Sequence, residues 1–246
     1  MKPIYSISPE IYSSYRPTYG DDIYNYISSL LEEKQIGWDC ACGSGQATTE
    51  VAKFVDYVIG SDSDSIQLEN ATKAKNIKYL HQTDTIDILK DSSVDLITVA
   101  TGIHWLDTNK FYAEAKRVLK KGGVLATWGY TGVDLNPEIN DVIKGIIKNH
   151  LLPYYPKEIQ IAFNQYREID LPMNKINAPN FEIKYNWDFE TLMNYIKSFT
   201  AMQRYLKVHE KSALALFEDE ILDAWGGDRS TKKELIWELH TKFTRK

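Results

Sequence analysis

Residues 38–46 read Trp-Asp-Cys-Ala-Cys-Gly-Ser-Gly-Gln, and this stretch decides the expected fold. It overlaps the end of a short apolar run at residues 36–40 and precedes a helical pattern at residues 47–54. A glycine loop between a strand and a helix lets backbone N–H groups approach a ligand, because glycine carries no Cβ. Seventeen positions beyond Gly45, at the end of the next apolar run, Asp62 is placed to accept hydrogen bonds from two ribose hydroxyls. The pair predicts a nucleoside site.

Strand and helix patterns alternate around this loop. Near-continuous apolar runs, of the kind found in buried parallel strands, occupy residues 57–59, 77–80, 94–100 and 124–128. These runs alternate with helical patterns at residues 65–74 and 109–119. Residues 181–189 and 235–243 instead alternate apolar and polar side chains, as half-buried antiparallel strands do. We therefore expect an α/β fold, a doubly wound Rossmann-like seven-stranded sheet with antiparallel final strands and a helical cap.

The chain divides into four expected segments. Residues 1–35, which contain a helical pattern at 21–34, form an N-terminal lid segment, and residues 36–130 form the ligand-binding core. Prolines interrupt residues 131–215, which we interpret as a cap insertion with an antiparallel strand near 181–189. Residues 216–246 supply a C-terminal helix and a closing strand.

Composition limits the function classes. The 246 residues carry a formal net charge of −5, so the basic surface that nucleic-acid binding requires is missing, and we expect no nucleic-acid partner. Cys40 and Cys42 have the spacing of neither a disulfide framework nor a zinc site, and the scattered histidines indicate no metal site. We find neither a secretory signal nor an apolar stretch long enough for a membrane span, which predicts a cytoplasmic protein without a membrane partner. The sequence carries no readable signal of oligomeric state.

Position 48 helps to choose the nucleoside. A dinucleotide fingerprint that starts at Gly43 requires glycine or alanine there, and Thr48 disfavours a nicotinamide cofactor. Residues 39–46 instead resemble the first motif of class I S-adenosylmethionine-dependent methyltransferases, acid-x-Gly-x-Gly-x-Gly, with Ala41 in place of the first glycine. The resemblance continues in order and spacing through residues 58–62, 91–97 and 117–123, within the methyltransferase type 11 group.

The resemblance implies S-adenosylmethionine as the cofactor. It also implies which residues hold this molecule, namely Tyr15, Arg16, Asp39, Ala41, Gly43, Gly45, Gln46, Asp62, Ser63, Asp84, Thr85 and Thr101. Asp84 and Thr85 would lie near the adenine, although a solvated turn accounts for these two residues equally well.

Residues 101–107 follow the fourth strand of the expected sheet and would face the transferable methyl group. The His104-Trp105 pair is similar to a subset of small-molecule methyltransferases, including the trans-aconitate and juvenile-hormone-acid types, which methylate carboxylates. His104 is the candidate catalytic residue: it would orient or charge-pair a carboxylate acceptor, or act as a base toward a hydroxyl or amine. Trp105 is a candidate substrate contact. The alternative interpretations are that His104 only stabilises its loop through local bonds and that Trp105 only packs. An Asn-Pro-Pro-Tyr-like element is absent, which disfavours methylation of nucleobase nitrogens.

Two further segments resemble parts of the same subset. Residues 12–19 match its Tyr-x-x-x-Arg-Pro-x-Tyr lead-in, so Tyr12 is a candidate substrate contact and Arg16 a candidate partner for a carboxylate. A disordered arm or a surface staple is the competing interpretation. Residues 195–202 resemble a helix near the acceptor, which makes Phe199 a candidate substrate contact, although its helical spacing with Leu192 and Ile196 is also that of a core helix.

These observations predict an enzyme that transfers a methyl group from S-adenosylmethionine to a small-molecule acceptor, with carboxylate O-methylation as the favoured class. Two alternatives remain open at this point: a non-catalytic module that binds the same cofactor, and a nicotinamide-dependent oxidoreductase.

Overall fold

The computed structural model of the chain describes residues 15–132, 137–209 and 213–246. These residues divide into two compact units. The sheet unit consists of Thr18–Thr131, Gln160–Phe181 and Leu239–Lys246. The helical unit consists of residues 15–17, Gly132–Ile159 and Glu182–Glu238. Residues 160–181 therefore group with the sheet, although they lie within the cap insertion expected from the sequence.

The described strands form one eight-stranded sheet. Five parallel strands are followed in space by β8, which is antiparallel to β5 and pairs with both β6 and β7. The strands are β1 (Ile36–Cys40), β2 (Tyr57–Asp62), β3 (Ile77–His81), β4 (Val94–Ala100), β5 (Leu119–Gly129), β6 (Asn174–Ile176), β7 (Phe181–Trp187) and β8 (Lys233–Arg245). The predicted α/β class with antiparallel final strands is confirmed. The sheet has one strand more than expected, because the three residues of β6 extend its edge.

The strand order β3-β2-β1-β4-β5 creates a switch point between β1 and β4. From β1 the chain proceeds outward to β2 and β3, and then returns to the other side of β1 for β4 and β5. Trp38 on β1 is in register with Ile59 on β2 and with Ile97 on β4. Ligands of such sheets bind beyond the carboxyl ends of the strands at the switch point, so β1, β2 and β4 define where the site must lie.

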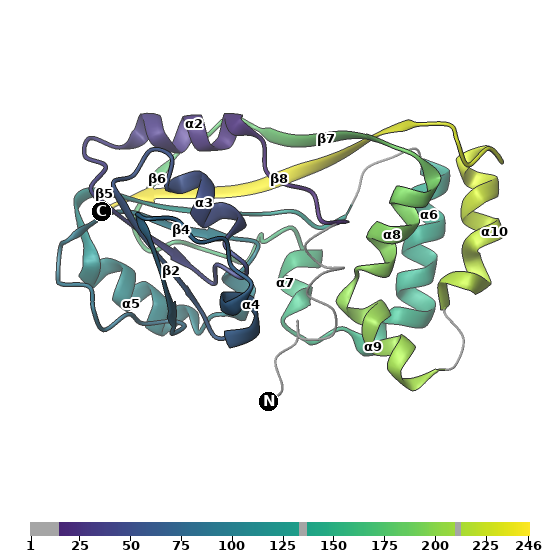
Figure 1. Cartoon of the computed structure of the whole chain (residues 1–246), viewed down its shortest axis with the longest axis horizontal. Coiled ribbons are helices and arrows are strands. Elements are labelled where there is room, and N and C mark those ends of the chain that lie inside the picture. The colour runs from purple at the N-terminus through teal and green to yellow at the C-terminus, as the bar shows by residue number, and fades with distance from the viewer. Residues whose placement is uncertain (1–14, 133–136, 210–212) are drawn as a thin grey trace. The chain divides into compact units, whose positions relative to one another are not determined.

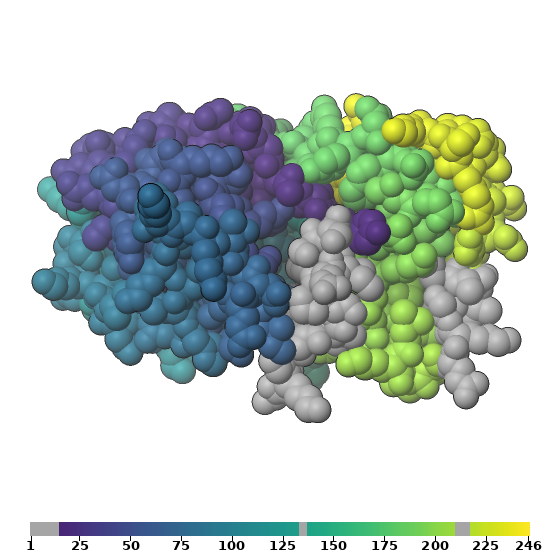
Figure 2. Space-filling model, in the orientation of Figure 1, coloured from purple at the N-terminus to yellow at the C-terminus, as the bar shows by residue number. Residues whose placement is uncertain are grey.

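Helices cover both faces of this sheet, and Figure 1 shows α2 and α5 on opposite sides of it. The face seen in Figure 2 carries much of the N-terminal half of the sheet unit, in purple and blue. Asp64 and Asp107 cap α4 and α5, because each side chain accepts a hydrogen bond from a backbone N–H of the first turn. The helices are α2 (Asp21–Leu30), α3 (Gln46–Val51), α4 (Ser65–Glu69), the 3₁₀ turn η1 (Ile103–Trp105), α5 (Thr108–Val118) and α7 (Ile159–Phe163).

Burial on both faces explains the near-continuous apolar strands. All residues of β4 from Val94 to Val99 are buried, and so are residues 124–129 of β5. Branched side chains fill this interior because the parallel sheet has a layer of helices on each side. The first five strands consequently hold their carboxyl ends in fixed positions.

The helical unit has its own apolar interior. The helix α10 packs beside α6 and beside α8 (Figure 1), and Leu192, Ile196 and Phe199 are buried at the spacing seen in the sequence. Beside them, the Trp237 Nε1–H donates to the Tyr195 hydroxyl at 3.1 Å. The elements are α6 (Pro137–Ile146), the π-helical η2 (Ile147–Leu151), η3 (Leu152–Tyr154), α8 (Phe189–Lys197), α9 (Thr200–Val208) and α10 (Ala213–Trp225). None of the helices in the described parts of the chain has the length and apolarity needed to cross a membrane.

Candidate functional site

The glycine loop turns between β1 and α3 through left-handed backbone conformations. Ala41, Gly43 and Gly45 have φ of 56°, 55° and 85°. The Gly45 N–H donates to the Cys42 carbonyl at 2.9 Å, which closes the turn. A Cβ added at Gly43 would meet nothing closer than the Gln67 amide oxygen at 3.9 Å, so a ligand can approach the backbone here.

Asp62 ends β2 and meets this loop directly. Its Oδ2 accepts a hydrogen bond from the Gly43 N–H at 2.8 Å, and its Oδ1 accepts one from the Asp64 N–H at 2.8 Å. Burial raises the pKa of this carboxyl above its usual value, although both hydrogen bonds oppose the shift. Two segments 19 residues apart thus converge as the sequence analysis requires. Gln46 opens α3 beside the loop, and Ser63 is exposed immediately after Asp62.

Asp39 lies beneath the loop. It has no exposed surface, and its two oxygens accept hydrogen bonds from the Thr48 hydroxyl at 2.6 Å and the Thr98 hydroxyl at 2.7 Å. Burial raises the pKa of Asp39 to about 6, against the lowering effect of both threonines. Asp39 therefore ties β1 to α3 and β4. This geometry gives Asp39 a role in positioning the loop, and its direct contact with the cofactor stays a prediction. Thr48 on α3 takes part in the same positioning.

The β3–β4 loop carries Asp84 and Thr85. Asp84 is half-buried, and its Oδ1 accepts a hydrogen bond from the Asp107 N–H at 2.9 Å. Thr85 is exposed. The Ile86 N–H, one residue further on, donates to Glu114 Oε1 on α5 at 3.0 Å. These bonds attach the loop to α5 and to the segment after η1.

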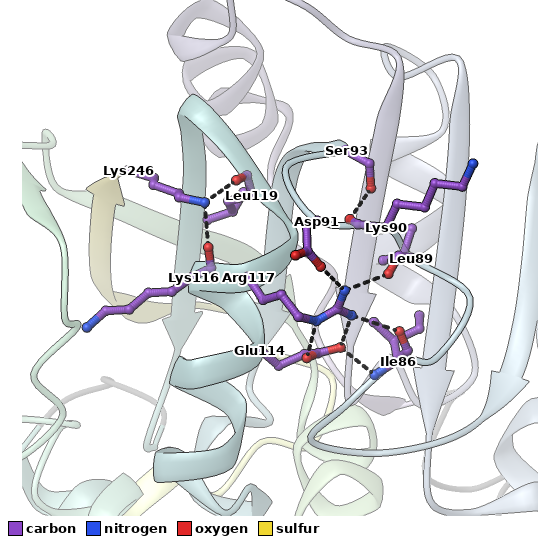
Figure 3. A network of polar contacts seen from close by, with 10 residues as sticks. All are labelled: Ile86, Leu89, Lys90, Asp91, Ser93, Glu114, Lys116, Arg117, Leu119 and Lys246. Carbon is purple, nitrogen blue, oxygen red and sulfur yellow. Dashed lines mark hydrogen bonds and ion pairs between the residues drawn. The ribbon is translucent and has the colours of Figure 1, made fainter.

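Arg117 on α5 secures the rest of the same loop (Figure 3). Its guanidinium donates to both oxygens of Glu114, at 2.9 and 2.6 Å, and to Asp91 at 2.7 Å. It also reaches the carbonyls of Leu89 and Ile86. Sequence reasoning missed this network, because a Glu-x-x-Arg spacing on a helix is commonplace and its targets lie 28 and 26 residues away.

The segment after β4 packs against the glycine loop. Thr101 has φ of 51°, its hydroxyl shares a hydrogen bond of 2.7 Å with the Tyr19 hydroxyl, and its N–H donates to the Trp128 carbonyl. A Cβ built on Gly102 would lie only 2.7 Å from the Ala41 Cβ. This close approach sets Thr101 and the following η1 turn beside the loop. Tyr19 belongs to the quoted lead-in stretch but was not singled out there.

His104 sits on η1 and is 5% exposed. Its Nδ1 is buried and has no hydrogen-bond partner among the residues that the structure describes. Burial lowers the pKa of His104 to about 4, so the imidazole is neutral at physiological pH. The ring centroid of Trp105 lies 4.6 Å away, and that of Tyr166 lies 5.8 Å away.

Arg16 and Phe199 come together in the helical unit. The Arg16 Nη2–H donates to the Ser198 carbonyl at 3.4 Å, and the guanidinium lies 5.7 Å from the ring centroids of Tyr195 and Phe199. Tyr15 is half-buried, whereas Tyr12 lies outside the described residues. The predicted roles of these four residues stay predictions. Within the described parts of the chain, no group of three or more His, Cys, Asp or Glu side chains is arranged to hold a metal ion.

Comparison with known proteins extends these observations. A family model described as a methyltransferase domain matches residues 38–127. A putative methyltransferase of Dictyostelium discoideum is 30% identical over 221 residues, which cover 87% of this chain and 83% of that protein. The chain belongs to the class I S-adenosylmethionine-dependent methyltransferases.

Other relatives of this methyltransferase agree. A probable S-adenosylmethionine-dependent methyltransferase of Saccharomyces cerevisiae is 27% identical over 194 residues, which span 75% of this chain and 61% of that protein. The structure of a putative type II methyltransferase from Anaeromyxobacter dehalogenans superposes with a TM-score of 0.84 at 24% identity, and covers 94% of this chain and 98% of the other. Because the superposition covers 94% of this chain, the fold shared with the Anaeromyxobacter dehalogenans protein includes the helical unit as well as the sheet unit.

Proposed function

We propose that this methyltransferase binds S-adenosylmethionine where the glycine loop meets Asp62, and transfers the methyl group to a small-molecule carboxylate beside His104. The observation that carries the cofactor site is the 2.8 Å hydrogen bond from the Gly43 N–H to Asp62 Oδ2. It brings the backbone loop and the nucleoside-recognising carboxylate to one place at the carboxyl ends of β1 and β2.

The residues present fit this cofactor. Asp62 is half-buried, and a carboxylate has about four acceptor positions, so Asp62 keeps the capacity to accept from a ribose hydroxyl beside its backbone N–H donors. The space above Gly43 admits a ligand close to the backbone. Asp84 lies near the start of the β3–β4 loop, where the resemblance expects the adenine.

The state of His104 supports a carboxylate as the acceptor. Bound S-adenosylmethionine supplies an electrophilic methyl group on a sulfonium, and a carboxylate acceptor is already nucleophilic without loss of a proton. A neutral imidazole with a pKa of about 4 is a weak base, which suits it poorly to deprotonate a hydroxyl or an ammonium group. It still has an N–H with which to orient a carboxylate oxygen. His104 therefore acts as an orienting hydrogen-bond donor in a site with little water.

Replacing Asp62 tests the cofactor site. Asp62→Ala removes the acceptor of the ribose hydroxyls and should weaken binding of S-adenosylhomocysteine by about 10- to 100-fold, as loss of hydrogen bonds to a charged group typically does. Isothermal calorimetry measures the change. Asp56→Ala is the matched control, because Asp56 is exposed ahead of the same strand. Equal affinity in the two variants would contradict the assignment.

Replacing His104 tests its role toward the acceptor. His104→Ala should lower kcat/KM by about 10-fold or more while the affinity for S-adenosylhomocysteine stays within about twofold of the wild type. His150→Ala serves as the histidine control. Full turnover in His104→Ala would give His104 a purely structural role.

A single-turnover assay tests the acceptor class. Methyl-labelled cofactor is incubated with trans-aconitate, juvenile hormone acid and other small carboxylic acids, each beside its own amide. Labelled methyl esters from acids, with no product from amides, are the expected result. Transfer of the label to the amides, or to amines included as controls, with none to the acids, would overturn the carboxylate assignment.

A further inference from the structure

The turn after α7 has a strained backbone. Gln165 and Tyr166 have φ of 59° and 55°, in the left-handed region that residues with a Cβ rarely adopt. The Gln165 N–H donates to the Ala162 carbonyl and the Tyr166 N–H to the Ile161 carbonyl, both at 2.8 Å. Two consecutive residues of this kind persist only where surrounding contacts hold them.

Lys242 on β8 supplies such contacts. Its ammonium group donates to the carbonyls of Arg167 and Ile169, on the far side of the turn from α7. Burial lowers the pKa of Lys242, since the ammonium group gives up water for these carbonyls. The turn is thus bonded to α7 on its N-terminal side and to β8 on its C-terminal side.

The turn delivers the Tyr166 ring to the end of β5. Tyr166 is 3% exposed, and a Cβ placed on Gly129 would lie 2.5 Å from its Cζ and hydroxyl oxygen. Only glycine at position 129 leaves room for the ring. The centroid of the Tyr166 ring lies 5.8 Å from that of His104 and 6.4 Å from that of His240 on β8.

We propose that Tyr166 is a positioning residue for His104: its ring and that of Trp105 pack near the imidazole and keep water from it, while the space left by Gly129 and the turn held by Lys242 fix the place of the Tyr166 ring. The consequence for the acceptor rests on the function proposed above. Residues 160–181 would then take part in acceptor recognition through a tyrosine on a turn that no family motif marks.

The electrostatic surroundings of His104 agree with this role. Burial is the cause of its low pKa, and the rings of Trp105, on its own turn, and of Tyr166 lie near it. Removing the Tyr166 ring would let water reach the imidazole and stabilise its charged form. Titration of His104 therefore reports whether Tyr166 encloses it.

The experiment follows the His104 imidazole by nuclear magnetic resonance in protein with labelled histidine, using His104→Gln to assign its signal. In the wild type and in Tyr166→Phe, which keeps the ring, His104 should remain neutral at pH 5.5. In Tyr166→Leu its pKa should rise by at least one unit toward 6.5. An unchanged titration in Tyr166→Leu would overturn the proposal, and so would a full shift in Tyr166→Phe.

A folding control uses the contact with Gly129. Gly129→Ala should strongly lower the melting temperature in the wild-type background and lower it much less in Tyr166→Leu, because leucine lacks the ring atoms that the new Cβ would meet. Gly145→Ala is the matched control, since a Cβ there meets nothing within 4 Å. Equal effects of Gly129→Ala in both backgrounds would show that Tyr166 does not occupy this place.

Kinetics separate this inference from the proposed function. Tyr166→Leu should raise the KM for the acid found in the single-turnover assay at least fivefold, with the affinity for S-adenosylhomocysteine unchanged. A shifted His104 titration together with full activity of His104→Ala would overturn the acceptor site and not the positioning of His104. An unshifted titration with an inactive His104→Ala would overturn the positioning alone.

Discussion

Ala41 stands in a left-handed conformation where the family motif has glycine. Such a conformation costs an L-residue about 1–2 kcal/mol, and the loop retains it because the Thr101–Gly102 segment packs over Ala41. Gly102 itself has φ of −127°, which any residue adopts, so it is glycine for space alone. Ala41 replaces a glycine of the motif, and Gly102, just after β4, leaves the space that the Ala41 Cβ occupies.

A double-mutant cycle tests this pair. Gly102→Ala should lower the free energy of unfolding by about 1–3 kcal/mol, because its Cβ would lie 2.7 Å from the Ala41 Cβ. In an Ala41→Gly background the loss should be at least halved, since that Cβ is gone. Urea unfolding of the four proteins gives the coupling energy. Additive losses would mean that the two residues do not share this contact.

At the scale of elements, α5 determines the course of the β3–β4 loop. Glu114 accepts the Ile86 N–H, and Arg117 fastens Leu89 and Asp91 (Figure 3). The Arg117 guanidinium lowers the pKa of Glu114, so this carboxylate is charged at neutral pH and its hydrogen bond to the loop is charge-assisted. The hydrogen bonds from α5, which follows the loop in sequence, therefore fix the position of the loop that contains Asp84.

Loss of the Glu114 carboxylate should release the loop. Glu114→Ala is expected to speed hydrogen exchange at the Ile86 amide about 10-fold or more and to weaken S-adenosylhomocysteine binding by about fivefold. Glu114→Gln keeps the accepting oxygen and should restore most of the protection. Asp91→Ala, which leaves the Glu114–Ile86 bond intact, is the control. Equal exchange rates in Glu114→Ala and the wild type would assign the loop position to other contacts.

At the scale of the whole molecule, two buried groups make opposite contributions to the pH dependence of stability. The pKa of Asp39 is raised to about 6, so its contribution to the free energy of unfolding is fully present below pH 3.8 and is lost as the pH rises through 6. The pKa of His104 is lowered to about 4, so its contribution is present above pH 6.5 and is lost as the pH falls through 4. Each change amounts to about 3 kcal/mol, and between pH 4 and 6 the two oppose each other.

Single variants should expose each contribution. As the pH rises from 4 to 6.5, the free energy of unfolding of Asp39→Asn should increase by about 3 kcal/mol relative to that of the wild type. That of His104→Gln should decrease by about the same amount relative to the wild type. Urea unfolding at several pH values measures these differences, and comparison with the wild type cancels the other titrating groups. Parallel curves for wild type and Asp39→Asn would show that Asp39 is charged throughout this range.

The sequence by itself determined the sheet and the edge of it at which we propose that the nucleoside binds. Near-continuous apolar runs specify strands that are buried on both faces, and the loop at Gly43 with Asp62 at the next strand end follows from local chain geometry. The family resemblance rests on the same residues, because those motifs are contiguous in sequence. The bounds of β1, β3, β4 and α5 follow the apolar patterns within a residue, whereas β5 begins five residues earlier than its pattern and α4 ends five residues earlier. The short elements α7 and β6 gave no periodic signal.

Only the tertiary structure decided how the side chains are used. Thr48 and Thr98 donate hydrogen bonds to the buried Asp39, and a glutamate 28 residues away accepts the Ile86 N–H. The ring of a tyrosine 62 positions further along the chain lies 5.8 Å from that of His104. Each depends on contacts between elements that are distant in sequence. Propensity and motif spacing describe only local preferences, whereas burial and hydrogen-bond partners arise when the elements pack.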